Sequence, residues 1–306
     1  MKELIKKWPL TDKDKLTMVL DSTGISRSEL ARTLEVNYKA VYRWLDKGIK
    51  PHPRQSRDID TLFKESVDMR SVVSGLKKII KNPIEVLKKE KKIRDRFFLE
   101  MTYNSNAIEG SRMTRQETEI ALEGKMVRGK EVFEMMEVIN HKNALIYLME
   151  KVKPGFKVDE GYVLKLHEIV MYDFQNKLPG RYRTGFVNLT NTEKVLPNAQ
   201  MVPIKMKQWI KHINKYGKDP IGKIAQDHYE FEEIHPFFDG NGRVGRLIMN
   251  TQLLAQGFPP ALIQIEDQQK YYTALGKGDM GEFKSLVQMV CESTIKGYLI
   301  LFGKDK

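Results

Sequence analysis

The chain has 306 residues, more than one ordinary domain contains, so its length predicts two domains. Hydrophobic residues make up 41% and charged residues 30%, and no eighteen-residue apolar run follows the basic N-terminus or occurs elsewhere, which argues against export and membrane spanning and favours the cytoplasm. The net charge is +12, and residues 1–95 hold 23 Lys and Arg against 14 Asp and Glu. Such a local excess of positive charge is typical of proteins that bind phosphate backbones, although a solvated lysine-rich helix gives the same count.

Residues 1–56 are expected to form a small helical domain with a helix-turn-helix. Ser26 and Glu29 have the spacing of a capping box, which predicts a helix start, and the second helix is YKAVYRWLDKG. The segment resembles the phage-repressor-like helix-turn-helix family, and this resemblance predicts DNA binding. The alternative is a helical adaptor that binds protein or only packs. The side chains expected to face DNA are Asn37, Tyr38, Lys39 and Arg43.

The rest of the chain reads as a basic helical linker and a larger helical domain. Residues 57–95 contain the run KKEKK and form the expected linker, with its lysines on a solvated face. Helical periodicity continues over residues 96–306. The exception is residues 185–204, where β-branched residues flank a polar turn and predict a β-hairpin. The fold class is therefore predicted to be all-α with one hairpin.

The segment HPFFDGNGRVGR, from His235 to Arg246, has the composition of a phosphate site. Glycines at the start of a helix expose N–H groups that favour an anion, and two arginines three residues apart can fork onto phosphate oxygens. Asp239 is a hard carboxylate suited to Mg²⁺, and His235, with an ordinary pKa of about 6.5, can take a proton from a hydroxyl. A Gly/Asn-rich loop alone would be only a turn. The anion-binding residues expected here are Gly240, Asn241, Gly242, Arg243 and Arg246.

This segment resembles the signature of the Fic family, His-x-Phe-x-Asp/Glu-Gly-Asn-Gly-Arg-x-x-Arg. The resemblance implies a helical fold with a hairpin flap and transfer of AMP from Mg·ATP to Ser, Thr or Tyr hydroxyls of a protein. It implies that His235 is the general base, Asp239 the Mg²⁺ ligand and residues 240–242 the phosphate nest. Arg243 would contact the β-phosphate and Arg246 the γ-phosphate. Because Arg243 stands where Doc-type kinases have lysine, AMP transfer is favoured over phosphate transfer.

The resemblance extends over residues 96–300. Residues 185–204 look like the flap, to whose edge a target segment would add as a strand. Tyr271 and Tyr272 resemble the aromatic pair that packs adenine; the alternative is that they are core aromatics. The stretch after them, TALGKGDMGEF, is shorter than the family's usual form and lacks its Asn, so the residues leave the choice of ATP over another nucleotide open.

The segment SNAIEG resembles the family's N-terminal inhibitory pattern, which places Ser105, Glu109 and Gly110 in an inhibitory helix over about residues 100–112. Glu109 is expected to form a bidentate pair with Arg246 and to occupy the fork that would hold the γ-phosphate. ATP phosphates would then be turned away from in-line attack. The alternative is that Glu109 is a plain surface carboxylate.

The sequence therefore predicts an autoinhibited protein adenylyltransferase that uses ATP and Mg²⁺ and acts on a protein target, and on itself where a hydroxyl is within reach. One alternative is a transcription regulator that senses nucleotide without turnover. Another is an enzyme of the same fold that transfers UMP or phosphocholine, or that removes AMP. DNA is an expected partner through the first domain. A homodimer is expected from the family layout alone, and no membrane partner is expected.

Overall fold

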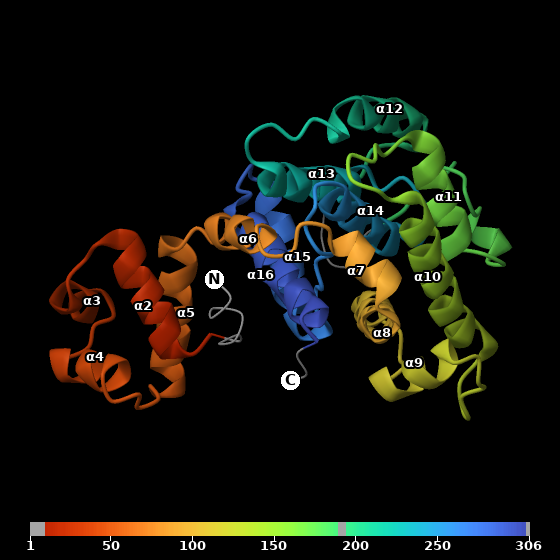
Figure 1. Ribbon diagram of the computed structural model, residues 1–306. Helices are drawn as coiled ribbons and strands as arrows, with labels where there is room; N and C mark the ends of the chain where they lie inside the picture. The colour runs from red at the N-terminus through yellow and green to blue at the C-terminus, as the bar shows by residue number, and fades with distance from the viewer. Residues whose placement is uncertain (1–9, 189–193, 304–306) are drawn as a thin grey trace. The chain divides into compact units, whose positions relative to one another are not determined.

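The computed structural model describes residues 10–188 and 194–303, which form two compact units divided between residues 79 and 80 (Figure 1). Throughout the described ranges the regular elements are α- and 3₁₀-helices, and no strand occurs in them. The all-α class is thus confirmed. In the same ranges, no helix combines the length and the apolar character that crossing a bilayer would require.

From residue 10 onward, where its description begins, the first unit contains five helices. Ser26 caps the second of them: its hydroxyl accepts from the Glu29 amide, and the Glu29 carboxylate accepts from the Ser26 amide, as the sequence predicted. The fourth helix packs on the first, so the compact unit extends beyond residue 56 into the segment expected as a linker. The helices are α2 (Asp12–Thr23), α3 (Arg27–Thr33), α4 (Tyr38–Leu45), α5 (Pro53–Ser66) and α6 (Met69–Lys77).

The second unit is arranged around α14 (Asn241–Ala255), all of whose residues are buried. A helix that exposes no face to solvent must be surrounded, and α14 packs against α8, α10, α11 and α13 (Figure 1). The surrounding helices are α7 (Pro83–Lys89), α8 (Lys91–Ile108), α9 (Arg115–Leu122), α10 (Val132–Lys151), α11 (Glu160–Val170), α12 (Val202–Ile213), α13 (Pro220–Ile234), α15 (Gln268–Gly278) and α16 (Lys284–Leu301), with short 3₁₀ turns η1 (Gln175–Lys177), η2 (Ala199–Met201) and η3 (Ile265–Asp267).

The hairpin predicted for residues 185–204 needs correction in the part that the structure describes. Residues 185–188 and 194–198 have no regular structure, and residues 199–204 are helical, belonging to η2 and the start of α12. Asn198 caps η2 by accepting from the Met201 amide, and Pro203 lies in the first turn of α12, where its fixed φ favours a helix. These local signals outweigh the β-propensity of the segment. Residues 189–193, which hold most of the predicted turn, lie outside the described residues.

Candidate active site

In the loop between α13 and α14, two residues of the signature have a left-handed backbone conformation. His235 ends α13 with φ of 48°, and Gly240 precedes α14 with φ of 76°. A Cβ on Gly240 would lie 2.8 Å from Met171 Sδ, so both the backbone conformation and the available space require glycine there. The loop thus turns sharply twice, and its glycines come close to a neighbouring element.

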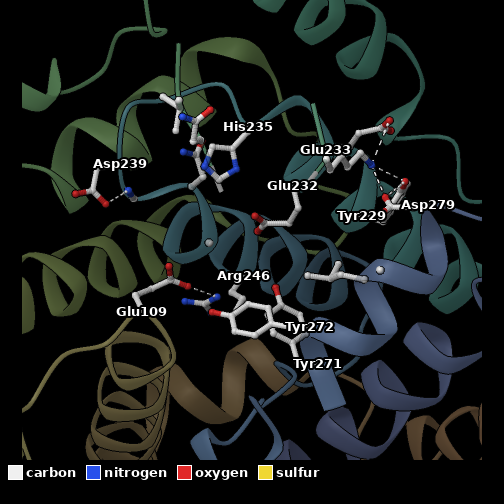
Figure 2. A pocket seen from close by; sticks show the side chains of 18 of the residues that line it. Glu109, Tyr229, Glu232, Glu233, His235, Asp239, Arg246, Tyr271, Tyr272 and Asp279 are labelled. Atoms are coloured by element: carbon white, nitrogen blue, oxygen red, sulfur yellow. Dashed lines mark hydrogen bonds and ion pairs between the residues drawn. The ribbon is translucent and has the colours of Figure 1, made fainter. Parts of the chain in front are cut away.

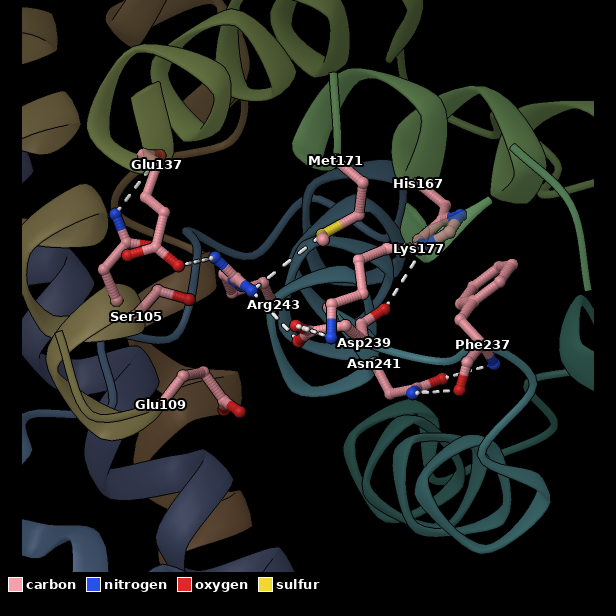
Figure 3. Close-up of polar contacts among 12 residues, drawn as sticks. Ser105, Glu109, Glu137, His167, Met171, Lys177, Phe237, Asp239, Asn241 and Arg243 are labelled. Atoms are coloured by element: carbon pink, nitrogen blue, oxygen red, sulfur yellow. Dashed lines mark hydrogen bonds and ion pairs between the residues drawn. The ribbon is translucent and has the colours of Figure 1, made fainter. Parts of the chain in front are cut away.

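Asn241 holds the loop in shape through its side chain. Its Nδ2 donates to the Phe237 carbonyl at 2.9 Å, and its Oδ1 accepts from the Phe237 amide at 2.9 Å (Figure 3). Phe237 is fully buried, and its ring stacks on the His167 ring with centroids 3.7 Å apart. The amide side chain of Asn241 is therefore committed to the loop, which leaves its backbone N–H at the helix start for an anion.

A second clamp ties the loop to the segment that follows Gly180. The buried Arg183 side chain donates from Nε to the His235 carbonyl at 2.8 Å and from Nη2 to the Pro197 carbonyl at 2.5 Å. Its backbone amide donates to the Pro236 carbonyl at 2.9 Å. Sequence reasoning did not find this role of Arg183, because nothing in the local pattern shows which carbonyls a guanidinium will meet.

His235 and Asp239 line one cavity of about 420 Å³ together with the loop glycines (Figure 2). Burial lowers the pKa of His235 to about 4, so its imidazole is neutral at pH 7, the form that a general base requires. The Asp239 side chain is 43% exposed. Its Oδ1 accepts from the Gly240 amide at 2.6 Å, and its Oδ2 lies 3.7 Å from Lys177 Nζ. An exposed carboxylate beside bare amides fits Mg²⁺, which takes one or two carboxylates together with phosphate oxygens.

Arg243 does not line the cavity, although the sequence pointed both arginines at phosphate. Its Nη1 donates to Glu137 Oε1 at 2.8 Å, and its Nη2 lies 3.3 Å from Asp239 Oδ1 and 3.9 Å from Met171 Sδ (Figure 3). The guanidinium is buried between these groups. In this arrangement Arg243 orients Asp239 and neutralises Glu137, a residue 106 positions earlier that sequence spacing cannot connect to it.

Arg246 is shared between Ser105 and Glu109, which both belong to the end of α8. Its Nε donates to Ser105 Oγ at 3.0 Å and its Nη2 to the Ser105 carbonyl at 2.8 Å. Only Nη1 faces Glu109, 2.9 Å from Oε1 (Figure 2). The contact is therefore a single ion pair and not the bidentate pair predicted, because Ser105 already occupies the other two nitrogens. Gly110 follows with φ of 94° and ends the helix.

Tyr271 and Tyr272 also line the cavity, with ring centroids 5.5 Å apart. The Tyr271 hydroxyl is buried and lies 2.7 Å from His228 Nε2, whereas Tyr272 is partly exposed and donates to the Ile108 carbonyl at 3.1 Å. The structure thus places the two predicted aromatics in the same cavity as His235 and Asp239.

Sequence reasoning also missed several other residues that line this cavity. Glu232 lies one helical turn before His235, and burial raises its pKa to about 8, although the nearby Arg246 opposes the rise. Its spacing from His235 was a usable signal, since residues three apart share a helix face. Elsewhere in the cavity, Lys194 donates to Tyr229 and Asp279, whose side chains lie close together in Figure 2. No local pattern indicates these contacts, because the three residues are far apart in the sequence.

The residues predicted to meet DNA lie in the first unit. Tyr38, Lys39 and Arg43 are exposed on α4. The Asn37 side chain is exposed as well, but its Oδ1 accepts from the Ala40 amide at 2.8 Å and caps the helix. Asn37 therefore has a structural role in the first turn of α4.

Comparison with known proteins places this site in a family. Residues 157–253 match the model of the Fic/DOC family. The chain is 33% identical over 233 residues to a protein adenylyltransferase Fic of Nematostella vectensis, covering 72% of this chain and 53% of that protein. It is 31% identical over 216 residues to protein adenylyltransferase fic-1 of Caenorhabditis elegans, covering 68% and 42%. The chain thus spans about half the length of the curated relatives it matches.

Solved structures agree on the fold. A Fic-1 fragment of C. elegans superposes with a TM-score of 0.67 at 22% identity, covering 99% of this chain and 90% of that one. A Fic-family protein of Desulfovibrio desulfuricans superposes with a TM-score of 0.60 at 27% identity, covering 75% and 70%. With the signature loop, the helical core around α14 and these similarities, the chain carries a Fic domain, which matches the Fic/DOC family over residues 157–253.

Proposed function

We propose that this chain is a protein adenylyltransferase that moves AMP from ATP to a Ser, Thr or Tyr hydroxyl of a protein and is restrained by Glu109. The observation that carries the proposal is the single cavity that brings His235, Asp239, the loop glycines and Arg246 together with Glu109. The curated relatives that share its domain are named protein adenylyltransferases, which supports the same activity here.

The proposed reaction is an in-line substitution at phosphorus. The hydroxyl oxygen of the target attacks the α-phosphorus of ATP, a new P–O bond forms, and the bond to the bridging oxygen of the β-phosphate breaks, releasing pyrophosphate. The neutral imidazole of His235 accepts the hydroxyl proton. When bound, Mg²⁺ would neutralise charge on the phosphate oxygens, and Asp239 is the residue that would hold it.

The role of Arg246 explains how Glu109 would restrain this reaction. The arginine is buried, and the Glu109 carboxylate 2.9 Å away already neutralises its one nitrogen not bonded to Ser105. A terminal phosphate of ATP would compete with that carboxylate for the same cation. As long as Glu109 stays paired with Arg246, the arginine does not hold the terminal phosphate of ATP, and the in-line alignment of the α-phosphate is lost.

The test is transfer of label from α-labelled ATP to protein in the presence of Mg²⁺. Glu109→Gly should raise incorporation by at least tenfold, since a charged contact to a buried arginine is worth about 1.5–3 kcal/mol. Glu123→Gly is the matched control, because Glu123 also caps a helix C-terminus but is exposed, and among the described residues it forms an ion pair only with Lys125. Equal incorporation by the parent and Glu109→Gly would reject the restraint.

His235→Ala then tests the chemistry itself. In the Glu109→Gly background it should reduce incorporation by about 10²–10⁴-fold while leaving ATP binding measurable by calorimetry. Binding without incorporation in every variant would favour the alternative of a nucleotide sensor. Labelled donors of UMP and of phosphocholine would detect transfer of another group. A target that already carries labelled AMP would detect removal of AMP.

We also propose that the first unit binds DNA through α4. The supporting observation is that Tyr38, Lys39 and Arg43 are exposed together on that helix. Fluorescence anisotropy with a random duplex should show binding that weakens with salt, and Arg43→Ala should reduce it. Arg32→Ala, at an exposed position on α3, is the control. Absence of binding at low salt would leave a protein adaptor as the remaining role.

A further inference from the structure

The last carbonyl of α8 is held by two side chains from α15. Ile108 ends the helix, so its carbonyl oxygen has no helical amide to accept from. Gln268 Nε2 donates to this oxygen at 2.7 Å, and the Tyr272 hydroxyl donates to it at 3.1 Å. A carbonyl has two lone pairs, and here both are used.

These two bonds fix the backbone from which Glu109 projects. Glu109 is the next residue, and its own amide is bonded back to Asn106 and Ala107. One turn earlier, the buried Asn104 side chain accepts from the Ile265 amide at 2.9 Å, so a second point of α8 is tied to the segment that leads into α15. The peptide before Glu109 is thus anchored to a neighbouring element and not only to its own helix.

Charge and space around Glu109 show why its placement matters. Its Oε1 lies 2.9 Å from Arg246 Nη1. The same oxygen lies against Gly242, and a Cβ added to Gly242 would be only 2.3 Å from it. A shift of the Ile108 peptide by about one ångström would break an ion pair whose normal length is about 2.7–2.9 Å. The anchor on Ile108 is therefore a condition for the pairing with Arg246.

We propose that Gln268 and Tyr272 are positioning residues for Glu109: they hold the Ile108 carbonyl and thereby keep the Glu109 carboxylate on Arg246. The inference rests on the proposed inhibitory role of Glu109. Tyr272 also lines the cavity, so a ligand that displaces its hydroxyl from Ile108 loosens Glu109 at the same time. The part of the cavity that Tyr272 lines is in this way connected to the residue that restrains the reaction.

The experiment measures AMP incorporation from α-labelled ATP by the full chain carrying Gln268→Met or Tyr272→Phe. Each change removes one donor with little change in volume, and each should raise incorporation about fivefold, the factor that corresponds to one ordinary hydrogen bond. Gln269→Met is the matched control, since Gln269 is the exposed neighbour of Gln268 and should leave incorporation at the parent level. In the Glu109→Gly background, Gln268→Met should give no further rise, because the residue it positions is gone.

Hydrogen exchange of the amides at residues 109–111 gives a readout independent of catalysis. Gln268→Met and Tyr272→Phe should speed their exchange relative to the parent, while Gln269→Met should not. Unchanged exchange and unchanged incorporation, with Glu109→Gly active, would overturn the positioning role. Faster exchange with no incorporation even by Glu109→Gly would instead support the positioning role and reject the proposed function. A uniform loss of activity with a lowered melting temperature would mark Gln268 as merely structural and also overturn the inference.

Discussion

Ser105 holds Arg246 by two hydrogen bonds, one to its hydroxyl at 3.0 Å and one to its backbone carbonyl at 2.8 Å, although the two residues are 141 positions apart in the sequence. The arginine is buried, so each acceptor that it loses leaves one of its N–H groups without a partner. This arrangement decides that one nitrogen alone is directed at Glu109.

Replacement of Ser105 by alanine should therefore destabilise the second unit. The change leaves the Arg246 Nε buried without its acceptor, at a cost of about 1–3 kcal/mol in the free energy of unfolding. Urea denaturation followed by circular dichroism measures it. Ser111→Ala is the control, because the Ser111 hydroxyl is buried with no hydrogen-bond partner among the described residues, and its removal should cost nothing or stabilise slightly. Equal losses in the two variants would contradict the role given to Ser105.

Gly242→Ala should test how closely the Glu109 side chain packs against Gly242. In an open helix the change would gain about 1 kcal/mol, but here the new methyl group would lie 2.3 Å from Glu109 Oε1 and 2.9 Å from Arg246 Nη1. We expect Gly242→Ala to lower the unfolding free energy of the parent and to lower it less, or raise it, in the Glu109→Gly background. A double-mutant cycle of unfolding free energies measures the coupling. Additive effects would show that the two groups do not compete for space.

Asn241→Ala should loosen the signature loop. It removes both hydrogen bonds to the Phe237 backbone and leaves a buried amide and carbonyl unpaired, so a loss of roughly 2–4 kcal/mol is expected. Asn176→Ala, at an exposed position, should stay within about 0.5 kcal/mol of the parent. Urea denaturation of the two variants side by side checks the difference. A loss below that of the control would show that the loop is held by its other contacts.

The stability of the second unit should fall in mild acid because of buried neutral histidines. The His167 Nδ1 accepts from the Gly180 amide at 3.0 Å, which leaves the proton on Nε2, 3.2 Å from the Asp239 carbonyl. Burial lowers the pKa of His167 to about 4. The unfolded chain binds this proton near pH 6.5, so the stabilisation is complete above pH 6.5 and is lost as the pH falls towards 4, by on the order of 3 kcal/mol.

Unfolding free energies measured between pH 4 and 7 test this expectation. His167→Gln should lower stability at pH 7 and flatten the fall below pH 6.5. Ser105→Ala removes a contact that does not titrate, so its curve should run parallel to that of the parent. The buried Glu232 has its pKa raised to about 8 and acts with the opposite sign, since its stabilisation is greatest below about pH 4.5 and declines as the pH rises. A parent-like slope in His167→Gln would remove His167 from the acid sensitivity.

The sequence by itself determined the features that depend on neighbouring residues. The capping box at Ser26, the helical class and the glycine turn before α14 follow from contacts within a few positions, and the structure contains them. The segment from His235 to Arg246 likewise predicted the proposed phosphate loop from its own residues, because the glycines, the carboxylate and the arginines lie within twelve positions of one another.

Only the tertiary structure decided where long side chains find their partners. It turned Arg243 to Glu137 and away from the cavity, divided Arg246 between Ser105 and Glu109, and joined α15 to the Ile108 carbonyl. Guanidinium groups reach in several directions, and the partners Glu137, Ser105 and Glu109 of Arg243 and Arg246 lie more than a hundred positions away in the chain. The folded packing therefore selects among partners that sequence spacing leaves equivalent.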